Sequence, residues 1–89
     1  MDEVRIKIYG QVHGVGFRYY TTLQARDLNL TGYARNLPDE SVEIVAQGTK
    51  ENLEKLIDWA RKGPRLAKVD RLESRFAAPE ENFTEFSVL

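Results

Sequence analysis

Apolar and polar residues alternate with a period of two in five stretches of the chain, which is the pattern of half-buried β-strands. The alternation is regular in the first, third and last of these stretches and looser in the fourth. A Pro-Asp-Glu-Ser sequence over residues 38–41 predicts a tight turn between the second and the third. The expected strands cover residues 4–9, 30–37, 42–46, 66–76 and 83–88.

Two other stretches have the 3.6-residue period of amphipathic helices. The second of them is the more regular, since Thr49 is placed to cap it and Gly63-Pro64 ends it. Its apolar stripe consists of Leu53, Leu56, Ile57 and Ala60. The first helix, expected over about residues 17–28, has a stripe that is softened by polar side chains. That stripe consists of Phe17, Tyr20, Thr21, Gln24 and Leu28.

The order of these elements, β-α-β-β-α-β followed by a short last strand, predicts an α+β fold of the ferredoxin-like type. In this sandwich two helices cover one face of an antiparallel sheet, and the extra C-terminal strand is expected at a sheet edge. Because the chain has only 89 residues, we expect residues 1–89 to form a single domain. The fold alone does not indicate a function, because RNA-binding modules, metallochaperones and small enzymes share it.

Composition excludes several classes of function. The chain has no cysteine and a single histidine, His13, so we expect no disulfide, no thiolate nucleophile and no metal site. A net charge of −1 is unlike the basic charge of non-specific nucleic-acid binders. No apolar run approaches a membrane span, and the acidic start of the chain is unlike a secretory signal. We therefore expect a cytoplasmic protein without nucleic-acid or membrane partners, and a monomer, because no exposed apolar stripe is evident.

The segment between the first strand and the first helix, residues 10–18 with the sequence GQVHGVGFR, is the main candidate for a binding site. Gly14 and Gly16 let the backbone turn several N–H groups toward one point beside the positive end of the helix dipole, which suits an anion of phosphate size. Arg18 could add a bidentate pair of hydrogen bonds. The loop has neither the ending of a P-loop nor the glycine spacing of a Rossmann turn. An ordinary strand-to-helix connection with an exposed arginine is the alternative interpretation.

A second candidate is Asn36, at the end of the second expected strand in the sequence TGYARNL of residues 31–37. Strands contain few asparagines, so this one calls for an explanation. It could hold a water molecule or a carbonyl group beside whatever the loop binds. Alternatively, its side chain caps the following turn by bonding to nearby backbone.

Taken together, the two segments resemble the two signatures of the acylphosphatases. Residues 10–18 resemble the first, Gly-x-Val-Gln-Gly-Val-x-Phe-Arg, and residues 32–36, followed by Asp39, Val42 and Gly48, resemble the second. The order of elements and the length match that family across essentially the whole chain. The resemblance implies hydrolysis of the carboxyl–phosphate bond of acyl phosphates without a metal or cofactor, with a small acyl phosphate as the partner.

Carried over to this chain, the resemblance implies that Arg18 binds the substrate phosphate together with backbone amides of the loop, and that Asn36 orients the attacking water. The expected catalytic residues are therefore Arg18 and Asn36. The expected phosphate-binding residues are Gln11, Val12, His13, Gly14, Val15, Gly16, Phe17 and Arg18.

Two residues depart from the family pattern. His13 stands where the family commonly has glutamine, and Glu40 where it commonly has glycine. A protonated imidazole at position 13 would add positive charge near the phosphate; the alternative is a structural or solvent-exposed ring. If the turn at residue 40 requires a positive φ, glutamate there costs about 1 kcal/mol or more. Neither residue replaces Arg18 or Asn36, so we expect the activity to be retained.

This small set of residues is sufficient for the implied chemistry. The leaving group of an acyl phosphate is a carboxylate, which departs without a proton, and phosphoryl transfer through a loose transition state needs little bond-making from the nucleophile. What remains is positioning and charge stabilisation, which one arginine, a ring of amides and one asparagine supply. An RNA-binding module is disfavoured, because the third strand carries no aromatic residue. The remaining alternative is a catalytically silent module that binds phosphate or acyl phosphates.

Overall fold

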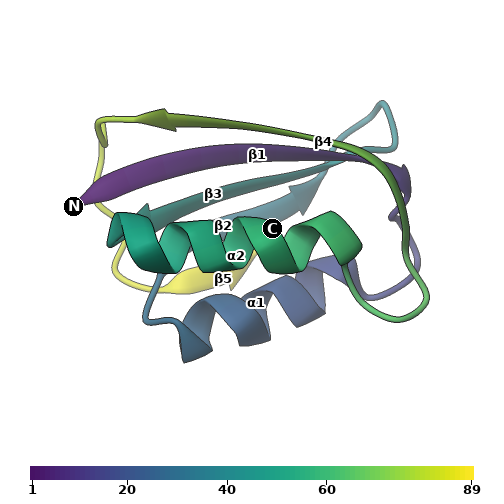
Figure 1. Ribbon diagram of the computed structural model, residues 1–89, viewed down its shortest axis with the longest axis horizontal. Coiled ribbons are helices and arrows are strands. Elements are labelled where there is room, and N and C mark those ends of the chain that lie inside the picture. The colour runs from purple at the N-terminus through teal and green to yellow at the C-terminus, as the bar shows by residue number, and fades with distance from the viewer.

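The computed structural model describes all 89 residues, which form two helices packed on one face of a five-stranded sheet (Figure 1). The elements are β1 Asp2–Gln11, α1 Phe17–Asp27, β2 Thr31–Asn36, β3 Val42–Gly48, α2 Lys50–Lys62, β4 Lys68–Ala77 and β5 Phe86–Val88. This order confirms the α+β, ferredoxin-like prediction, and the short last strand lies at a sheet edge as expected. Neither helix has the length and apolar character of a membrane span.

The strands lie in the order β4-β1-β3-β2-β5, and every neighbouring pair is antiparallel except β2 and β5, which run parallel. The last strand is shorter than expected and begins only at Phe86. One reason is that the N–H of Phe83 donates to the side chain of Gln47 (3.2 Å) rather than to a strand. The Phe83 ring packs edge-on against Tyr33 on the face of the sheet away from the helices. The segment around Phe83 therefore lies on the face of the sheet opposite the helices, and the chain joins the sheet edge only at β5.

Alternation along β1 and β3 places three side chains of each strand under the helices. These six are Val4, Ile6, Ile8, Val42, Ile44 and Ala46, each at most 1% exposed. The stripe of α2 packs against them as predicted, and Leu53 and Leu56 are fully buried. Burying one such aliphatic side chain stabilises the fold by roughly 1.5–3 kcal/mol. The side chain of Thr49 caps α2 by accepting a hydrogen bond from the N–H of Asn52.

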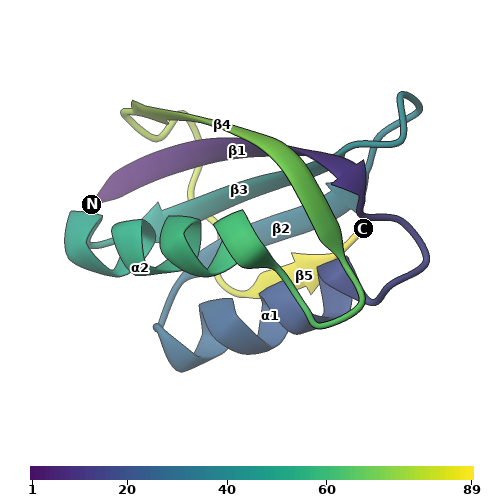
Figure 2. The same cartoon turned by 45° about the vertical axis from the view of Figure 1, so that its right-hand side comes forward.

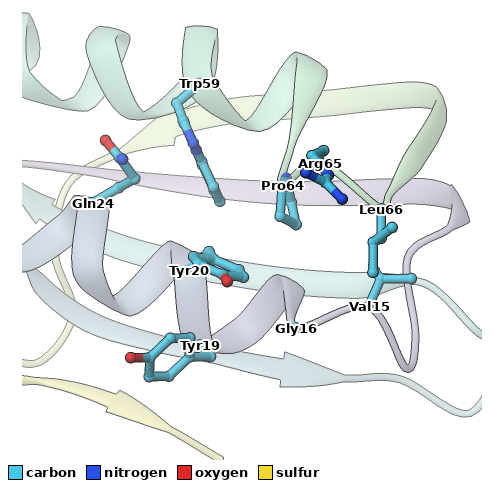
Figure 3. A pocket seen from close by; sticks show the side chains of 9 residues that line it. All are labelled: Val15, Gly16, Tyr19, Tyr20, Gln24, Trp59, Pro64, Arg65 and Leu66. Atoms are coloured by element: carbon cyan, nitrogen blue, oxygen red, sulfur yellow. The ribbon is translucent and has the colours of Figure 1, made fainter.

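The first helix presents a different face to the core from the one that its stripe predicted. Phe17 and Thr21 are buried as expected, together with Thr22 and Ala25, but Tyr20 is 46% exposed. The prediction was wrong for Tyr20 because α1 packs against β2 and β5, which turns its buried face toward that edge of the sheet (Figure 2). Tyr20 points instead into the space between the two helices (Figure 3).

One end of the sheet brings together segments that are far apart in the sequence. The loop that joins β1 to α1 lies there beside the end of β2 and the end of β5 (Figure 2). Val12, Asn36 and Val88, which come from these three segments, line one cavity. The two sequence segments that carry the family resemblance therefore meet at this end of the molecule.

Candidate active site

The loop between β1 and α1 owes its shape to glycines in the left-handed region. Gly14 has φ of 72°, and Gly16, the N-cap of α1, has φ of 79°. A residue with a Cβ rarely adopts this conformation, so the glycines determine how the chain enters the helix. Gly16 has no capping side chain, so the first N–H groups of α1 have no side-chain partner. Free amides at a helix N-terminus are the groups that an anion requires.

A small cavity of about 170 Å³ lies at the mouth of this loop. Its walls come from the loop, the first turn of α1, the end of β2 and the end of the chain. The lining residues are Val12, Gly14, Gly16, Phe17, Arg18, Tyr19, Asn36 and Val88. Arg18 and Asn36, the two expected catalytic residues, thus face the same cavity although they come from different elements.

Three of the expected phosphate-binding residues do not line this cavity. Gln11 is the last residue of β1 and is paired with Lys68 of β4. The side chain of Val15 points to the other side of the loop (Figure 3). The side chain of His13 is also outside the cavity, held by a separate contact. The cavity wall on the loop side therefore consists of Val12, the glycines and the start of α1.

The guanidinium group of Arg18 is held in place by the last residue of the chain. Its Nη1 donates a hydrogen bond of 2.7 Å to the main-chain oxygen of Leu89. Leu89 in turn donates its N–H to the carbonyl oxygen of Ala34 in β2 (2.9 Å). An arginine side chain has five N–H donors, so this contact leaves others free for a ligand. Nothing in the sequence indicated this role for Leu89, because the contact spans 71 positions.

The side chain of Asn36 makes no hydrogen bond within the protein. The turn after it closes through other groups: the N–H of Leu37 donates to the carbonyl oxygen of Ser41 (2.8 Å), and Ser41 donates to the carboxylate of Asp39. The alternative prediction, in which the side chain of Asn36 caps this turn, is therefore wrong. Asn36 is exposed at the cavity, with both its carbonyl and its amino group available.

His13 connects the loop to the turn between β2 and β3. Its Nε2 lies 2.8 Å from the carbonyl oxygen of Ser41. A carbonyl oxygen only accepts hydrogen bonds, so Nε2 carries a proton and donates it in this contact. The ring is half-buried and does not reach the cavity, so its observed role is a structural one.

The turn contacted by His13 contains the second departure from the family pattern. Glu40 has φ of 70°, so this position does require the left-handed conformation that glycine adopts readily. Asp39 holds the turn by accepting hydrogen bonds from Ser41 and by pairing with Lys7 of β1 at 2.9 Å. The hydrogen bonds from Ser41, followed by that from Lys7, hold the pKa of the Asp39 carboxyl well below its usual range. The same pair, led by the hydrogen bond to Asp39, raises the pKa of Lys7.

A second, larger cavity adjoins the first. It has a volume of about 710 Å³ and lies between α1, the C-terminal half of α2 and the connection from α2 to β4 (Figure 3). Gly16 and Tyr19 line both cavities. The larger cavity contains neither Arg18 nor Asn36, so the smaller one is the better candidate for the site of chemistry.

The fold and the cavity together define a class of protein. It is a two-layer α+β domain in which a glycine-containing loop, an arginine and an asparagine line one cavity. A sequence model of the family described as Acylphosphatase matches residues 4–88. An acylphosphatase of Thermococcus kodakarensis is 49% identical over 82 residues, which cover 90% of each chain. An acylphosphatase of Methylococcus capsulatus is 45% identical over 89 residues, which cover 100% of this chain and 97% of that one.

Solved structures agree with the sequence comparison. The crystal structure of acylphosphatase from Bacillus subtilis superimposes with a TM-score of 0.96 at 31% sequence identity, covering 100% of this chain and 99% of that one. The chain belongs to the acylphosphatase family. This confirms the resemblance that the two sequence segments indicated.

Proposed function

We propose that this chain is an acylphosphatase that hydrolyses the carboxyl–phosphate bond of acyl phosphates to a carboxylate and inorganic phosphate. The observation that carries the proposal is the shared cavity of Arg18, Asn36 and the glycine-containing loop. The names of the relatives and the match to the family support it. The reaction is R–CO–OPO₃²⁻ + H₂O → R–COO⁻ + HPO₄²⁻ + H⁺, and it proceeds without a metal or a covalent enzyme intermediate.

The phosphate is bound by Arg18 and by backbone N–H groups of the loop and the first turn of α1. Each charge-assisted hydrogen bond contributes about 1.5–3 kcal/mol, so a few of them give useful affinity for a small dianion. The contact of Arg18 with Leu89 holds the guanidinium before the substrate arrives. Such pre-organisation lowers the cost of ordering the side chain on binding.

Asn36 orients the attacking water. Its side-chain carbonyl accepts a hydrogen bond from the water, and this leaves an oxygen lone pair directed at the phosphorus. The absence of any competing bond from Asn36 to the protein supports this role. No carboxylate or imidazole lines the cavity, which agrees with a reaction whose leaving group needs no general acid.

The test is the hydrolysis of benzoyl phosphate, followed by absorbance in the presence of EDTA. Wild-type protein is expected to turn over substrate, and Arg18→Ala is expected to lose nearly all activity. Arg61→Ala is the matched control, because Arg61 is an exposed arginine on α2 away from the cavity. Wild-type activity in Arg18→Ala would overturn the proposed role of Arg18.

The alternative of a catalytically silent binding module is tested in the same samples. Inorganic phosphate would raise the Tm of an enzyme and of a silent binder alike, because both bind it in the folded state. Only the enzyme would consume acyl phosphate. Folded wild-type protein that binds phosphate without turnover would favour the silent module.

We further infer that residues 1–89 act as one domain, as a monomer in the cytoplasm. One hydrophobic cluster connects both helices with the sheet, which supports a single domain. The lack of cysteine supports a compartment where no disulfides are needed. Light scattering at assay concentration tests the monomer.

A further inference from the structure

The larger of the two cavities described above lies beside the site of Arg18 and Asn36 and has no role in the proposed chemistry. Its volume of about 710 Å³ is in the range of small-molecule binding sites. The cavity at Arg18 has about 170 Å³, which is room for little more than the phosphate end of a substrate. The rest of any larger acyl phosphate must lie elsewhere.

The two cavities adjoin one another at the start of α1. Gly16 and Tyr19 line both of them. At Gly16 a Cβ atom would lie 3.2 Å from the ring of Tyr20, so the ring covers the glycine closely. The ring of Tyr20 therefore lies next to Gly16 on the side of the larger cavity.

The walls of the larger cavity expose apolar surface that a free protein normally buries. Tyr19, Tyr20 and Leu66 are 59%, 46% and 70% exposed. The two tyrosine rings pack edge to face with centroids 5.2 Å apart. Figure 3 shows Tyr20 and Trp59 facing one another across the cavity from α1 and α2. Exposed apolar side chains gathered around one hollow are typical of a site that a ligand covers.

One cation stands at this cavity without an anionic partner. Arg65, in the connection from α2 to β4, takes part in none of the ion pairs of the protein. Figure 3 shows it between Pro64 and Leu66 at the border of the cavity. An unpaired guanidinium beside apolar walls is suited to a ligand that joins a hydrocarbon body to an anionic group.

We propose that the larger cavity binds the acyl group of the substrate and favours an aromatic acyl group that carries an anionic substituent. The inference rests on the proposed acylphosphatase function. With the phosphate beside Arg18, the acyl carbon lies at the rim formed by Gly16 and Tyr19, and its substituent extends toward Tyr20 and Leu66. An acetyl group has one methyl beyond the carbonyl and offers these walls little surface, whereas a benzoyl group offers a whole ring.

The experiment compares kcat/KM for benzoyl phosphate with kcat/KM for acetyl phosphate. In Tyr20→Ala and in Leu66→Ala the benzoyl-to-acetyl ratio is expected to fall about five- to tenfold, mainly through KM for benzoyl phosphate, because apolar contact with the ring is lost. Leu23→Ala is the matched control, since Leu23 is a 44% exposed residue of α1 that does not line the cavity. Tm measurements show that each variant is folded.

The outcomes separate the subsite from the function on which it rests. If the wild type hydrolyses both substrates and neither variant changes the ratio, the acyl subsite is overturned while the acylphosphatase function stands. An equal loss with both substrates would also overturn it, because an acyl subsite acts on the larger group. If the wild type hydrolyses neither substrate, the proposed function fails and the subsite with it.

A second arm tests Arg65 with 4-carboxybenzoyl phosphate. Arg65→Gln is expected to lower kcat/KM for this substrate about three- to fivefold relative to benzoyl phosphate, as for a partly exposed ion pair. Arg61→Gln is the control, because Arg61 does not line the cavity. The same ratio in Arg65→Gln and wild type would overturn the preference for an anionic substituent.

Discussion

Arg18 and Leu89 are joined by a hydrogen bond of 2.7 Å from the guanidinium Nη1 to the main-chain oxygen of Leu89, although 71 positions separate them. Through this bond the end of the chain determines where the guanidinium lies in the cavity. Because β5 precedes Leu89 and pairs with β2, the orientation of Arg18 depends on the sheet edge as well as on its own helix.

Truncation before Leu89 is therefore expected to lower kcat/KM about tenfold, which corresponds to roughly 1.4 kcal/mol of lost positioning. Leu89→Ala keeps the main-chain oxygen and is expected to retain nearly wild-type activity. Steady-state kinetics on both proteins, with Tm values to confirm folding, checks this. Equal activity in the truncated and substituted proteins would show that the contact does not position Arg18.

Asn36→Ala is expected to lower kcat for benzoyl phosphate about 10- to 100-fold with little change in KM, because a residue that orients water acts on the reacting state rather than on phosphate binding. Asn82→Ala is the control, since Asn82 lies outside this cavity. A rise in KM with unchanged kcat would contradict the proposed role and assign Asn36 to substrate binding.

His13→Gln is expected to leave the pH dependence of KM unchanged between about pH 5.5 and 7.5. The imidazole is hydrogen-bonded to Ser41 outside the cavity, so the ring is not directed at the phosphate. Glutamine can donate to the same carbonyl oxygen and keep the loop tied to the turn. A KM that rises in the variant only at the acidic end would show that protonated His13 does assist binding.

Glu40→Gly is expected to stabilise the protein by about 0.5–1 kcal/mol, because φ of 70° at this position strains any residue with a Cβ. In a domain of this size the gain corresponds to a rise in Tm of roughly 2–8 °C. Glu40→Ala removes the carboxylate but keeps the Cβ, so it is expected to show no such gain. Thermal unfolding of the three proteins is the measurement, and equal Tm values for Gly and Ala would argue against strain.

Asp39 is expected to contribute stability at neutral pH that is lost in acid. Its folded pKa is lowered by Ser41 and Lys7 from an ordinary value of 3.8, so the stabilisation is fully present above that value and declines as the pH falls toward the folded pKa. The difference in Tm between wild type and Asp39→Asn should therefore shrink below about pH 4. A difference that stays constant from about pH 7 to pH 2.5 would mean that the carboxylate charge does not hold the turn.

Much of the fold was predictable because its signals are local. The alternation of Val4, Ile6 and Ile8 and the spacing of Leu53 and Leu56 each report burial along a single element. Such a pattern is visible wherever one face of an element is buried and the other exposed. The motif in the loop before α1 and the asparagine at the end of β2 likewise indicated the two parts of the candidate site.

The sequence did not reveal features that depend on what an element packs against. The stripe of α1 included Tyr20, but the parallel pairing of β5 with β2 turned that helix and left Tyr20 at the larger cavity. The bond from Arg18 to Leu89 is equally invisible in the sequence, since no local pattern relates positions so far apart. Local patterning thus specified the elements and the site residues, whereas long-range packing set the orientation of Arg18 and formed the cavity beside it, because both need contacts between segments distant in the chain.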